Sequence, residues 1–325
     1  MPEGDTIFRA ARTLHRALAG ATVTRFETQY AHVARVHDDA PITGRRIEKI
    51  EARGKHLLMF FSRTGARDSR LGERLAQPDD HALTVATRES EPDSFAARLS
   101  TRLRDLEGPV VLRTHMLMSG SWHIYRTGEA WQRSSTNARL IVGTADFVGV
   151  GFNVPIAEFV PASALDKDEA IARLGPDVLS PDFDAAEAMT RLAGSVRPTV
   201  AEALLQQQAV AGIGNVYKSE LLFLARLWPF QPPALVTPVQ WARLLRDARV
   251  LLEANVLDPA DTGVVTWRGM RRTTGRANPA QRLYVYGRHG RPCRRCGTPI
   301  RMRHHGEHNR STYWCPLCQP EPAGG

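Results

Sequence analysis

Four cysteines near the end of the chain place the strongest constraint on its fold. They form two CxxC pairs, Cys293 with Cys296 and Cys315 with Cys318, separated by eighteen residues, and the chain has no other cysteine. Two close pairs of thiolates on two tight turns make the closed tetrahedral site that a structural zinc ion prefers. Two disulfides in a secreted protein are the alternative. Because no apolar signal segment precedes residue 20, we expect a reducing compartment and a zinc-held hairpin.

The positive charge of the chain is concentrated around these cysteines. Between Arg268 and Cys318 there are twelve arginines, no lysine and a single acid, Glu307, which gives a formal charge of +11. The whole chain carries +9, so the remaining residues sum to −2. A local excess of arginine favours a polyanionic partner, because the planar guanidinium makes two-pronged contacts with phosphate. A solvated basic face is the alternative interpretation.

Length and hydrophobic patterning indicate the fold class. With 325 residues and 42% hydrophobic content, the chain can bury two cores in addition to the cysteine hairpin. No run of eighteen apolar residues is present, so we expect no membrane span. Strand-like alternation fills 21–61 and 110–155, and helical patterns follow at about 164–174, 199–208, 216–227 and 238–255. The sequence therefore predicts an α+β protein in which an N-terminal antiparallel β-sandwich precedes a helical region.

The start of the chain carries candidate chemistry. Met1, Pro2 and Glu3 precede an amphipathic helical pattern, for which Asp5 is the expected N-cap. If Met1 is removed, Pro2 presents a secondary amine, and an α-amino group with a pKa near about 8 is partly unprotonated at neutral pH. Such an amine can attack an aldehyde-like carbon and hold it as an iminium, while Glu3 carries protons. Many chains begin with Met-Pro, so these residues alone do not assign the chemistry.

Three further positions each allow a structural and a functional interpretation. Lys55, in a predicted turn between two strands, is either a solvated turn lysine or a phosphate contact. Met118, at the end of a predicted strand, is a core residue when considered in isolation. Gly212 and Gly214 flank Ile213 ahead of Asn215, which predicts a positive-φ turn whose amides make a phosphate seat, or else a plain helix connection.

Residues 62–109 differ in composition from the segments on either side. They are rich in Arg, Asp, Glu and Ser and show only a faint helical pattern. We predict a long mobile insertion between two paired strands, to which no chemistry is assigned.

Seven motifs occur in a fixed order between residues 2 and 319. They are PE, RGKHLL, THMLMSGSW, LGPDVL, GIGNVYKSE, VYGRHGRPCRRCGTPI and NRSTYWCPLCQ. In this order they resemble the formamidopyrimidine-DNA glycosylase and endonuclease VIII family of base-excision repair enzymes, and the resemblance covers nearly everything except 62–109 and the last few residues. It implies a catalytic β-sandwich domain at 2–158, a helical DNA-binding domain with a helix-two-turn-helix module at 159–282, and a zinc finger at 283–320.

The resemblance also implies roles for individual residues in catalysis. Pro2 is similar to the family's nucleophile, which forms a Schiff base with the sugar of the damaged nucleotide. Glu3 is similar to its acid/base partner. Lys55 resembles the lysine of the sandwich domain that holds phosphate near the lesion. A bifunctional enzyme of this kind removes the base and then cleaves the strand by elimination.

Three other residues resemble the family's DNA contacts. Asn215 corresponds to the seat for a backbone phosphate, and Arg310, on the zinc hairpin, to the fork that grips another phosphate. Met118 corresponds to the side chain that enters the duplex to fill the gap left by the flipped nucleotide. An apolar filler of this kind is needed because the glycosidic carbon cannot be reached inside a stacked duplex.

The resemblance sets further expectations and leaves two alternatives open. It implies damaged double-stranded DNA as partner, one structural zinc ion, no nucleotide cofactor, and a cytoplasmic, nucleoid-associated monomer. Thr6 stands where the family has a second glutamate, and 146–149 lacks the family's arginine-phenylalanine pair. These departures favour the endonuclease VIII-like branch and oxidised pyrimidines. An oxidised-purine glycosylase and a non-catalytic damaged-DNA-binding protein are the alternatives.

Overall fold

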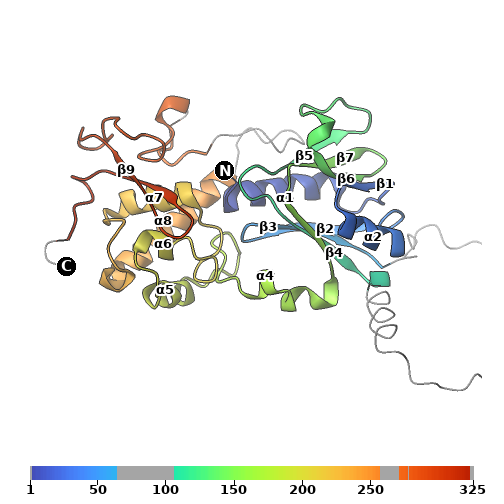
Figure 1. The fold of residues 1–325 in the computed structure, drawn as a ribbon, viewed down its shortest axis with the longest axis horizontal. Coiled ribbons are helices and arrows are strands. Elements are labelled where there is room, and N and C mark those ends of the chain that lie inside the picture. Colours follow the sequence, from blue (N-terminus) through green and yellow to red (C-terminus); the bar gives the residue numbers. More distant parts are fainter. Residues whose placement is uncertain (1, 64–105, 257–270, 277, 323–325) are drawn as a thin grey trace, which may run out of the picture.

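The computed structural model describes residues 2–63, 106–256, 271–276 and 278–322. The strands of the N-terminal half lie on one side of the molecule, and the helices between residues 185 and 256 lie on the other (Figure 1). The N-terminus is placed at the boundary between these two halves, beside the helices of the second half (Figure 1).

The N-terminal half contains two four-stranded sheets, ordered β1-β6-β7-β5 and β2-β3-β4-β8, and all their strand pairs are antiparallel. The strands are β1 Arg25–Thr28, β2 Ile47–Arg53, β3 His56–Phe61, β4 Val110–His115, β5 Ser121–Arg126, β6 Ala138–Gly143, β7 Phe147–Phe152 and β8 Ile156–Pro161, with a 3-10 turn at Ser135–Asn137. Strands β3 and β4 pair directly, with Phe61 opposite Val110. The predicted insertion therefore leaves the sheet at the end of β3 and re-enters it at the start of β4. Its predicted mobility and faint helix fall largely on 64–105, outside the described residues.

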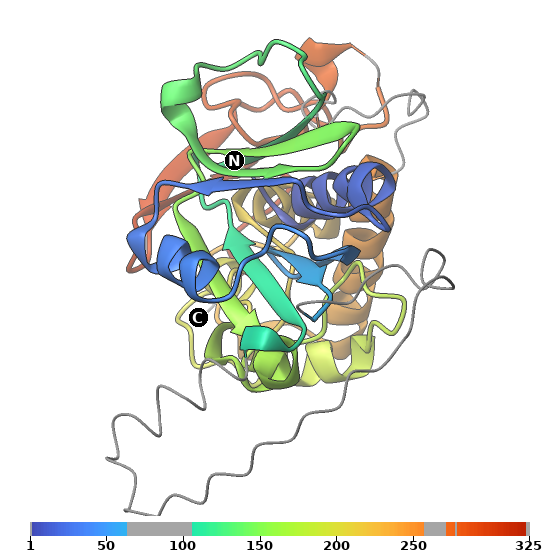
Figure 2. The ribbon, with the colours of Figure 1, turned by 90° about the vertical axis from the view of Figure 1, so that its right-hand side faces the viewer.

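Helix α1 (Gly4–Leu18) connects the two sheets to the C-terminal half. It contacts β2 and β3 of one sheet, β5 and β7 of the other, and α8 in the second half (Figure 2). The predicted apolar face is confirmed, because its members are all buried: Ile7, Ala11, Leu14 and Leu18. The predicted N-cap is wrong. The helix begins at Gly4 with Glu3 as its cap residue, and Asp5 lies in the first turn, where Arg271 binds it.

One helix lies where only strands were predicted. Helix α2 (Ala31–Asp39) buries a single side chain, that of Val33, so its sequence carries little helical periodicity. Tertiary contacts fix it instead. The hydroxyl of Tyr30 donates to the carbonyl oxygen of Val154, and the His32 ring bonds the carbonyl oxygen of Ala157 at 2.7 Å.

A buried arginine fastens the base of the insertion. Arg45 is 1% exposed, and its guanidinium donates to the carbonyl oxygens of Leu106 at 2.7 Å, Gly108 at 2.9 Å and Pro41 at 2.9 Å. The planar fork therefore satisfies carbonyl groups on both sides of the 64–105 segment, which keeps the ends of β3 and β4 in register.

The C-terminal half is helical, with the elements η2 Ala162–Lys167, α4 Glu169–Ala172, α5 Ala185–Ala193, α6 Val200–Ala203, α7 Asn215–Ala225, η3 Pro233–Leu235 and α8 Pro238–Val256. The two long predicted helices, now α7 and α8, are present within two residues of their expected bounds. The two others are shorter than predicted. Asp168 caps α4 and so divides 164–174 into two pieces. The Gln207 side chain bonds the carbonyl oxygen of Ile213 and the amide of Gly212, which holds 204–213 as a loop.

The cysteine segment forms a two-stranded hairpin, with β9 at Arg301–His305 and β10 at Arg310–Trp314, preceded by a short turn η4 at Pro279–Gln281. It packs on α7 through a small buried cluster: Phe223, Val285, Cys293, Ile300 and Cys315. The predicted fold class is thus confirmed as an antiparallel sandwich followed by helices and a cysteine hairpin. Within the described residues, no helix is long and apolar enough to cross a membrane.

Candidate functional site

Glu3 is fixed by the helix that follows the predicted phosphate loop. Its side chain is fully buried, and its carboxylate accepts hydrogen bonds from the amides of Val216 at 2.7 Å and Tyr217 at 3.3 Å. These amides belong to the first turn of α7, where the partial positive charge of a helix favours an anion. The carboxylate therefore joins the start of the chain to the C-terminal half.

Glycines make this close approach feasible. A Cβ atom on Gly214 would lie 2.3 Å from Cγ of Glu3, and one on Gly4 would lie 2.8 Å from the backbone of Gly212. The amide of Gly4 donates to the carbonyl oxygen of Gly212 at 2.9 Å, and Gly212 has the positive φ that was predicted, +97°. Glu3 accepts the amides of Val216 and Tyr217, so these two amides are not open to a phosphate, while the phosphate contact of Asn215 stays a prediction.

A second carboxylate beside Pro2 is paired with an arginine from the basic segment. Asp5 is 1% exposed and receives two bonds from Arg271, at 2.6 Å and 3.0 Å. Arg271 also donates to the hydroxyl of Thr6 at 3.2 Å and lies over the ring of Tyr217. Burial alone raises the pKa of Asp5, but the attraction of Arg271 outweighs it and leaves this pKa below its ordinary value.

A cavity of about 660 Å³ opens beside Pro2. Its lining includes Met118 of the β4–β5 loop, and Asp5 is the single acidic side chain among its described lining residues. Six arginines face it: Arg9, Arg133, Arg271, Arg282, Arg288 and Arg291. A larger cavity of about 910 Å³, between α1, β2 and 171–182, contains none of the predicted site residues. Pro2 thus lies at an arginine-rich hollow suited to an anionic ligand.

The wall of this cavity is held by another buried carboxylate. Glu220 on α7 is fully buried and accepts bonds from three successive amides, those of Tyr284, Val285 and Tyr286, each at 2.8 Å. The hydroxyl of Thr273 donates to the same carboxylate. With all four donors from 273–286, Glu220 sets the path of the segment that carries Arg282 and that lies between Arg271 and Arg288.

Lys55 lies in the turn between β2 and β3, as predicted, and lines a different cavity of about 590 Å³ together with His56 and His115. Burial lowers the pKa of its amine to about 8, Glu3 acts to raise it, and Arg310 and Arg271 act to lower it. The turn is tied to the C-terminal half, because the amide of Gly54 donates to the carboxylate of Asp177 at 2.6 Å. The amine of Lys55 is therefore partly neutral near physiological pH.

The β4–β5 loop presents an exposed apolar tip. Met118 is 65% exposed and Leu117 is 46% exposed, and Leu117 has a positive φ of 44°. The guanidinium of Arg310 contacts the sulfur of Met118 at 3.7 Å. The structure thus brings together two of the predicted DNA contacts, one from each half of the molecule.

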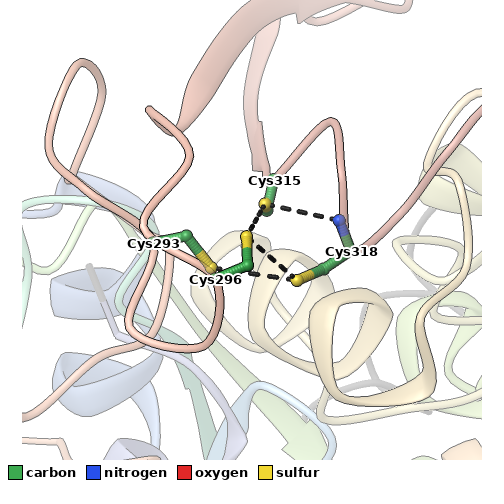
Figure 3. A group of neighbouring side chains, drawn as sticks. All are labelled: Cys293, Cys296, Cys315 and Cys318. Carbon is green, nitrogen blue, oxygen red and sulfur yellow. Dashed lines mark hydrogen bonds between the residues drawn. The ribbon is translucent and has the colours of Figure 1, made fainter.

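The four cysteines converge at the base of the hairpin (Figure 3). Their sulfur atoms all lie within 4.8 Å of one another, with separations of 3.4 Å between Cys296 and Cys315 and 4.0 Å between Cys293 and Cys318. A tetrahedron of sulfurs about 2.3 Å from a zinc ion has edges of about 3.8 Å, so the spacing fits that ion. Burial and the neighbouring sulfurs raise the pKa of Cys318 to about 12. Its thiol is therefore protonated at neutral pH, as expected before a cation binds. These residues could therefore hold a metal ion.

Comparison with known proteins places this arrangement in a family. Residues 1–148 match the formamidopyrimidine-DNA glycosylase N-terminal domain, and residues 174–264 match the formamidopyrimidine-DNA glycosylase H2TH domain. The chain belongs to the formamidopyrimidine-DNA glycosylase family. Its family membership, predicted from seven motifs, is thereby confirmed.

Several relatives of this family align over almost the whole chain. The "Probable endonuclease 8 2" of Streptomyces coelicolor is 36% identical over 326 residues, covering 99% of this chain and 95% of the relative. The "DNA-(apurinic or apyrimidinic site) lyase Nei2" of Mycolicibacterium smegmatis is 33% identical, covering 98% and 99%. A structure of Lactococcus lactis Fpg with DNA that contains an abasic site has the same fold, with a TM-score of 0.69, 20% identity, and coverage of 98% of this chain and 100% of that one.

Sequence reasoning missed the residues that hold the site together. Asp5, Glu220 and Lys218 are buried charged side chains, and each has at least one partner far away in the sequence. A signal was available for Lys218 and Glu220, since both belong to the motif GIGNVYKSE, and Asp5 stands two residues after the PE motif. Arg271 carried no signal that distinguished it from the other arginines of its segment.

Proposed function

We propose that this protein is a bifunctional DNA glycosylase and abasic-site lyase of base-excision repair that acts on oxidised bases in duplex DNA. The observation that supports this most strongly is the position of Pro2 at an arginine-lined cavity, next to the fixed carboxylate of Glu3. Once Met1 is removed, the nitrogen of Pro2 forms a bond to C1′ of the flipped nucleotide as the glycosidic bond breaks and the base leaves with a proton. The proline nitrogen then loses its proton, the C1′–O4′ bond of the sugar opens, and O4′ takes up a proton, which leaves an iminium at C1′. The iminium acidifies C2′, so loss of a C2′ proton breaks the C3′–O bond and cleaves the strand.

The basic residues around the cavity supply the grip that nucleotide flipping requires. Extruding a nucleotide costs a few kcal/mol of stacking and pairing, and phosphate contacts on both sides of the lesion offset this cost. Lys55 from the sandwich, with Asn215 and Arg310 from the second half, are the proposed contacts. The exposed Met118 is the proposed filler of the gap, because it projects an apolar side chain beside Arg310.

We place this activity in the endonuclease VIII-like branch, with oxidised pyrimidines preferred. The 146–149 segment supports this, because it contains no arginine and its Phe147 packs against the sandwich core. The proposed site of action is the bacterial nucleoid, where a chain with an arginine-rich segment meets its polyanionic substrate.

A panel of duplexes tests this function. The substrates carry thymine glycol, an oxidised purine or an abasic site, and each reaction is run with and without borohydride. We expect cleavage and a covalent adduct, strongest with the abasic site and with thymine glycol. Tight binding of these duplexes without adduct or cleavage on any of them would instead mean that the protein is a non-catalytic binding protein. Faster release of the oxidised purine than of thymine glycol would reverse the proposed lesion preference.

The hairpin is proposed to hold one structural zinc ion through its four cysteines, which stabilises a segment with only a small apolar core of its own. Because zinc binding contributes about 10–16 kcal/mol to the folding of such hairpins, Cys315→Ser is expected to lose the metal and the hairpin structure together. Metal content per chain, measured by mass spectrometry, should fall from one zinc to almost none. The exposed His308 is a potential ligand outside the cluster, so His308→Ala should keep the zinc. Full zinc content in Cys315→Ser would contradict the assignment.

A further inference from the structure

Helix α7 contains a lysine that is entirely buried. The side chain of Lys218 is 0% exposed, and its ammonium donates to the side-chain oxygen of Asn215 at 2.6 Å and to the carbonyl oxygen of Ser311 at 3.0 Å. Lysine is almost never fully buried unless a carboxylate pairs with it. Among the described residues, no carboxylate lies within ion-pair distance of this ammonium, and both of its partners are neutral oxygens.

These contacts organise the proposed phosphate contacts of the C-terminal half. The amide nitrogen of Asn215 donates to the hydroxyl of Ser311 at 3.2 Å, while its oxygen faces Lys218. The orientation of the amide is thereby fixed, with one N–H left beyond these contacts for a further acceptor. Ser311 directly follows Arg310 in β10, so the same ammonium joins α7 to the strand that carries the guanidinium.

The charged groups around Lys218 come from four elements. Glu3 at the start of the chain and Glu202 on α6 act to raise the pKa of its amine, Arg310 on β10 acts to lower it, and His305 on β9 is a further neighbour. The carboxylate of Glu3 is engaged by the α7 amides, and that of Glu202 by Thr199. Burial is the largest influence and lowers the pKa of Lys218 to about 7.

We propose, on the basis of the proposed function, that Lys218 is a further positioning residue for DNA, whose buried ammonium sets Asn215 and Arg310 into one phosphate site and has the bound phosphodiester as its counter-charge. Lys218 does not touch the phosphate. It acts through Asn215, and through the positive field that it adds behind Asn215. A bound phosphate adds a negative charge that stabilises the charged form of this amine further.

A consequence is proton uptake on DNA binding. A phosphodiester next to Asn215 raises the pKa of Lys218. At a pH between the pKa of the free protein, about 7, and the higher pKa of the complex, the amine of Lys218 therefore takes up a proton when DNA binds. Above about pH 7 the affinity is expected to fall by up to about tenfold per pH unit, since one pKa unit corresponds to a factor of ten. Lys55, with its pKa of about 8, is expected to add a second decrease in DNA affinity about one pH unit higher.

The test measures proton uptake by calorimetry in buffers of different ionisation enthalpy, using a duplex that carries the non-cleavable tetrahydrofuran abasic analogue. Lys218→Met keeps the length of the side chain and removes its charge. Its binding should be about tenfold weaker near pH 7, with the uptake step near that pH lost. Arg310→Ala removes a direct phosphate contact and should lower the slope of log affinity against log salt by about 0.9. Lys167→Met is the control, because Lys167 is exposed, and it should behave as the native protein.

A second measurement does not depend on the folding of a variant. The chain has only four lysines, so the native protein with labelled lysine side chains gives four titrating signals by NMR, and conservative Arg variants of Lys49, Lys55 and Lys167 assign the remaining signal to Lys218. We expect that signal to titrate near pH 7 without DNA and at clearly higher pH with it. A Lys218 signal that DNA leaves unmoved, or a folded Lys218→Met with native affinity and native proton uptake, overturns the proposal. If the native protein cleaves damaged duplex in that case, the repair function stands. If the native protein binds no damaged duplex at all, the function itself fails.

Discussion

Glu3→Gln is expected to slow base removal by about 10²–10⁴-fold, the range typical for losing a positioned acid/base group. The carboxylate of Glu3 accepts two amide bonds at the start of α7 and lies 3.9 Å from Arg271. Glutamine has almost the same shape, but its NH₂ group faces backbone donors and it carries no negative charge. The variant therefore loses both the proton carrier and the charge that stabilises a developing cation at the sugar.

A comparison of substrates separates these chemical effects from misfolding. An abasic site already presents an aldehyde, so trapping at that site does not require departure of a base and should be less affected than excision of thymine glycol. The control is Glu48→Gln, which makes the same change at an exposed position of β2 and should leave both rates unchanged. Native excision rates in Glu3→Gln, measured in single-turnover reactions, would remove Glu3 from the chemistry.

Arg271→Met is expected to lower the free energy of unfolding by about 3–5 kcal/mol at neutral pH, the usual cost of leaving one member of a buried ion pair without its partner. Asp5 is 1% exposed and receives both of its short charged bonds from Arg271. The variant also loses the stacking of the guanidinium over Tyr217. Urea denaturation followed by tryptophan fluorescence measures the change.

The size of this effect should depend on pH. In the native protein the net pKa of Asp5 is lowered, so its pairing stabilises the fold above the ordinary carboxyl range and is lost as the pH falls through the lowered pKa. In Arg271→Met, burial is opposed only by the attraction of Arg9 and by a backbone bond from Thr6, so the pKa of Asp5 rises, and the destabilisation is largest at neutral pH and shrinks as the pH falls.

The neighbouring residue offers a matched control for Arg271. The side chain of Arg272 is exposed, so Arg272→Met removes the same charge from the same segment and should change the free energy of unfolding by less than about 0.5 kcal/mol. Equal effects of the two substitutions, or a loss in Arg271→Met that does not depend on pH, would mean that the Asp5 pair does not stabilise the fold as argued.

The sequence predicted the features that depend on local spacing. The cysteine spacing, the buried face of α1, the pairing of the strands around the insertion and the positive φ of Gly212 all follow from residues close together in the chain. Seven ordered motifs were enough for the family, because their order carries information that no single motif has.

The remaining features depend on contacts between distant residues, which no local pattern encodes. No sequence pattern distinguishes Arg45 from the exposed arginines, although the structure buries it against the carbonyl oxygens of Leu106 and Gly108. The glycines before Asn215 suggested an open seat for phosphate, but their space is filled by Glu3, more than two hundred residues earlier. The sequence does not distinguish Lys218 from an ordinary helical lysine either, because its two neutral partners come together only when the hairpin packs on α7.

The most direct test of the account locates the covalent bond. The protein is trapped with borohydride on a duplex carrying an abasic site, digested with a protease, and sequenced by tandem mass spectrometry. We predict that the sugar remnant is attached to the α-nitrogen of Pro2, on a peptide that begins at Pro2 and lacks Met1. A trapped peptide that still begins with Met1, or a remnant attached to Lys55, would contradict the claim that a freed proline amine at the arginine-lined cavity is the nucleophile.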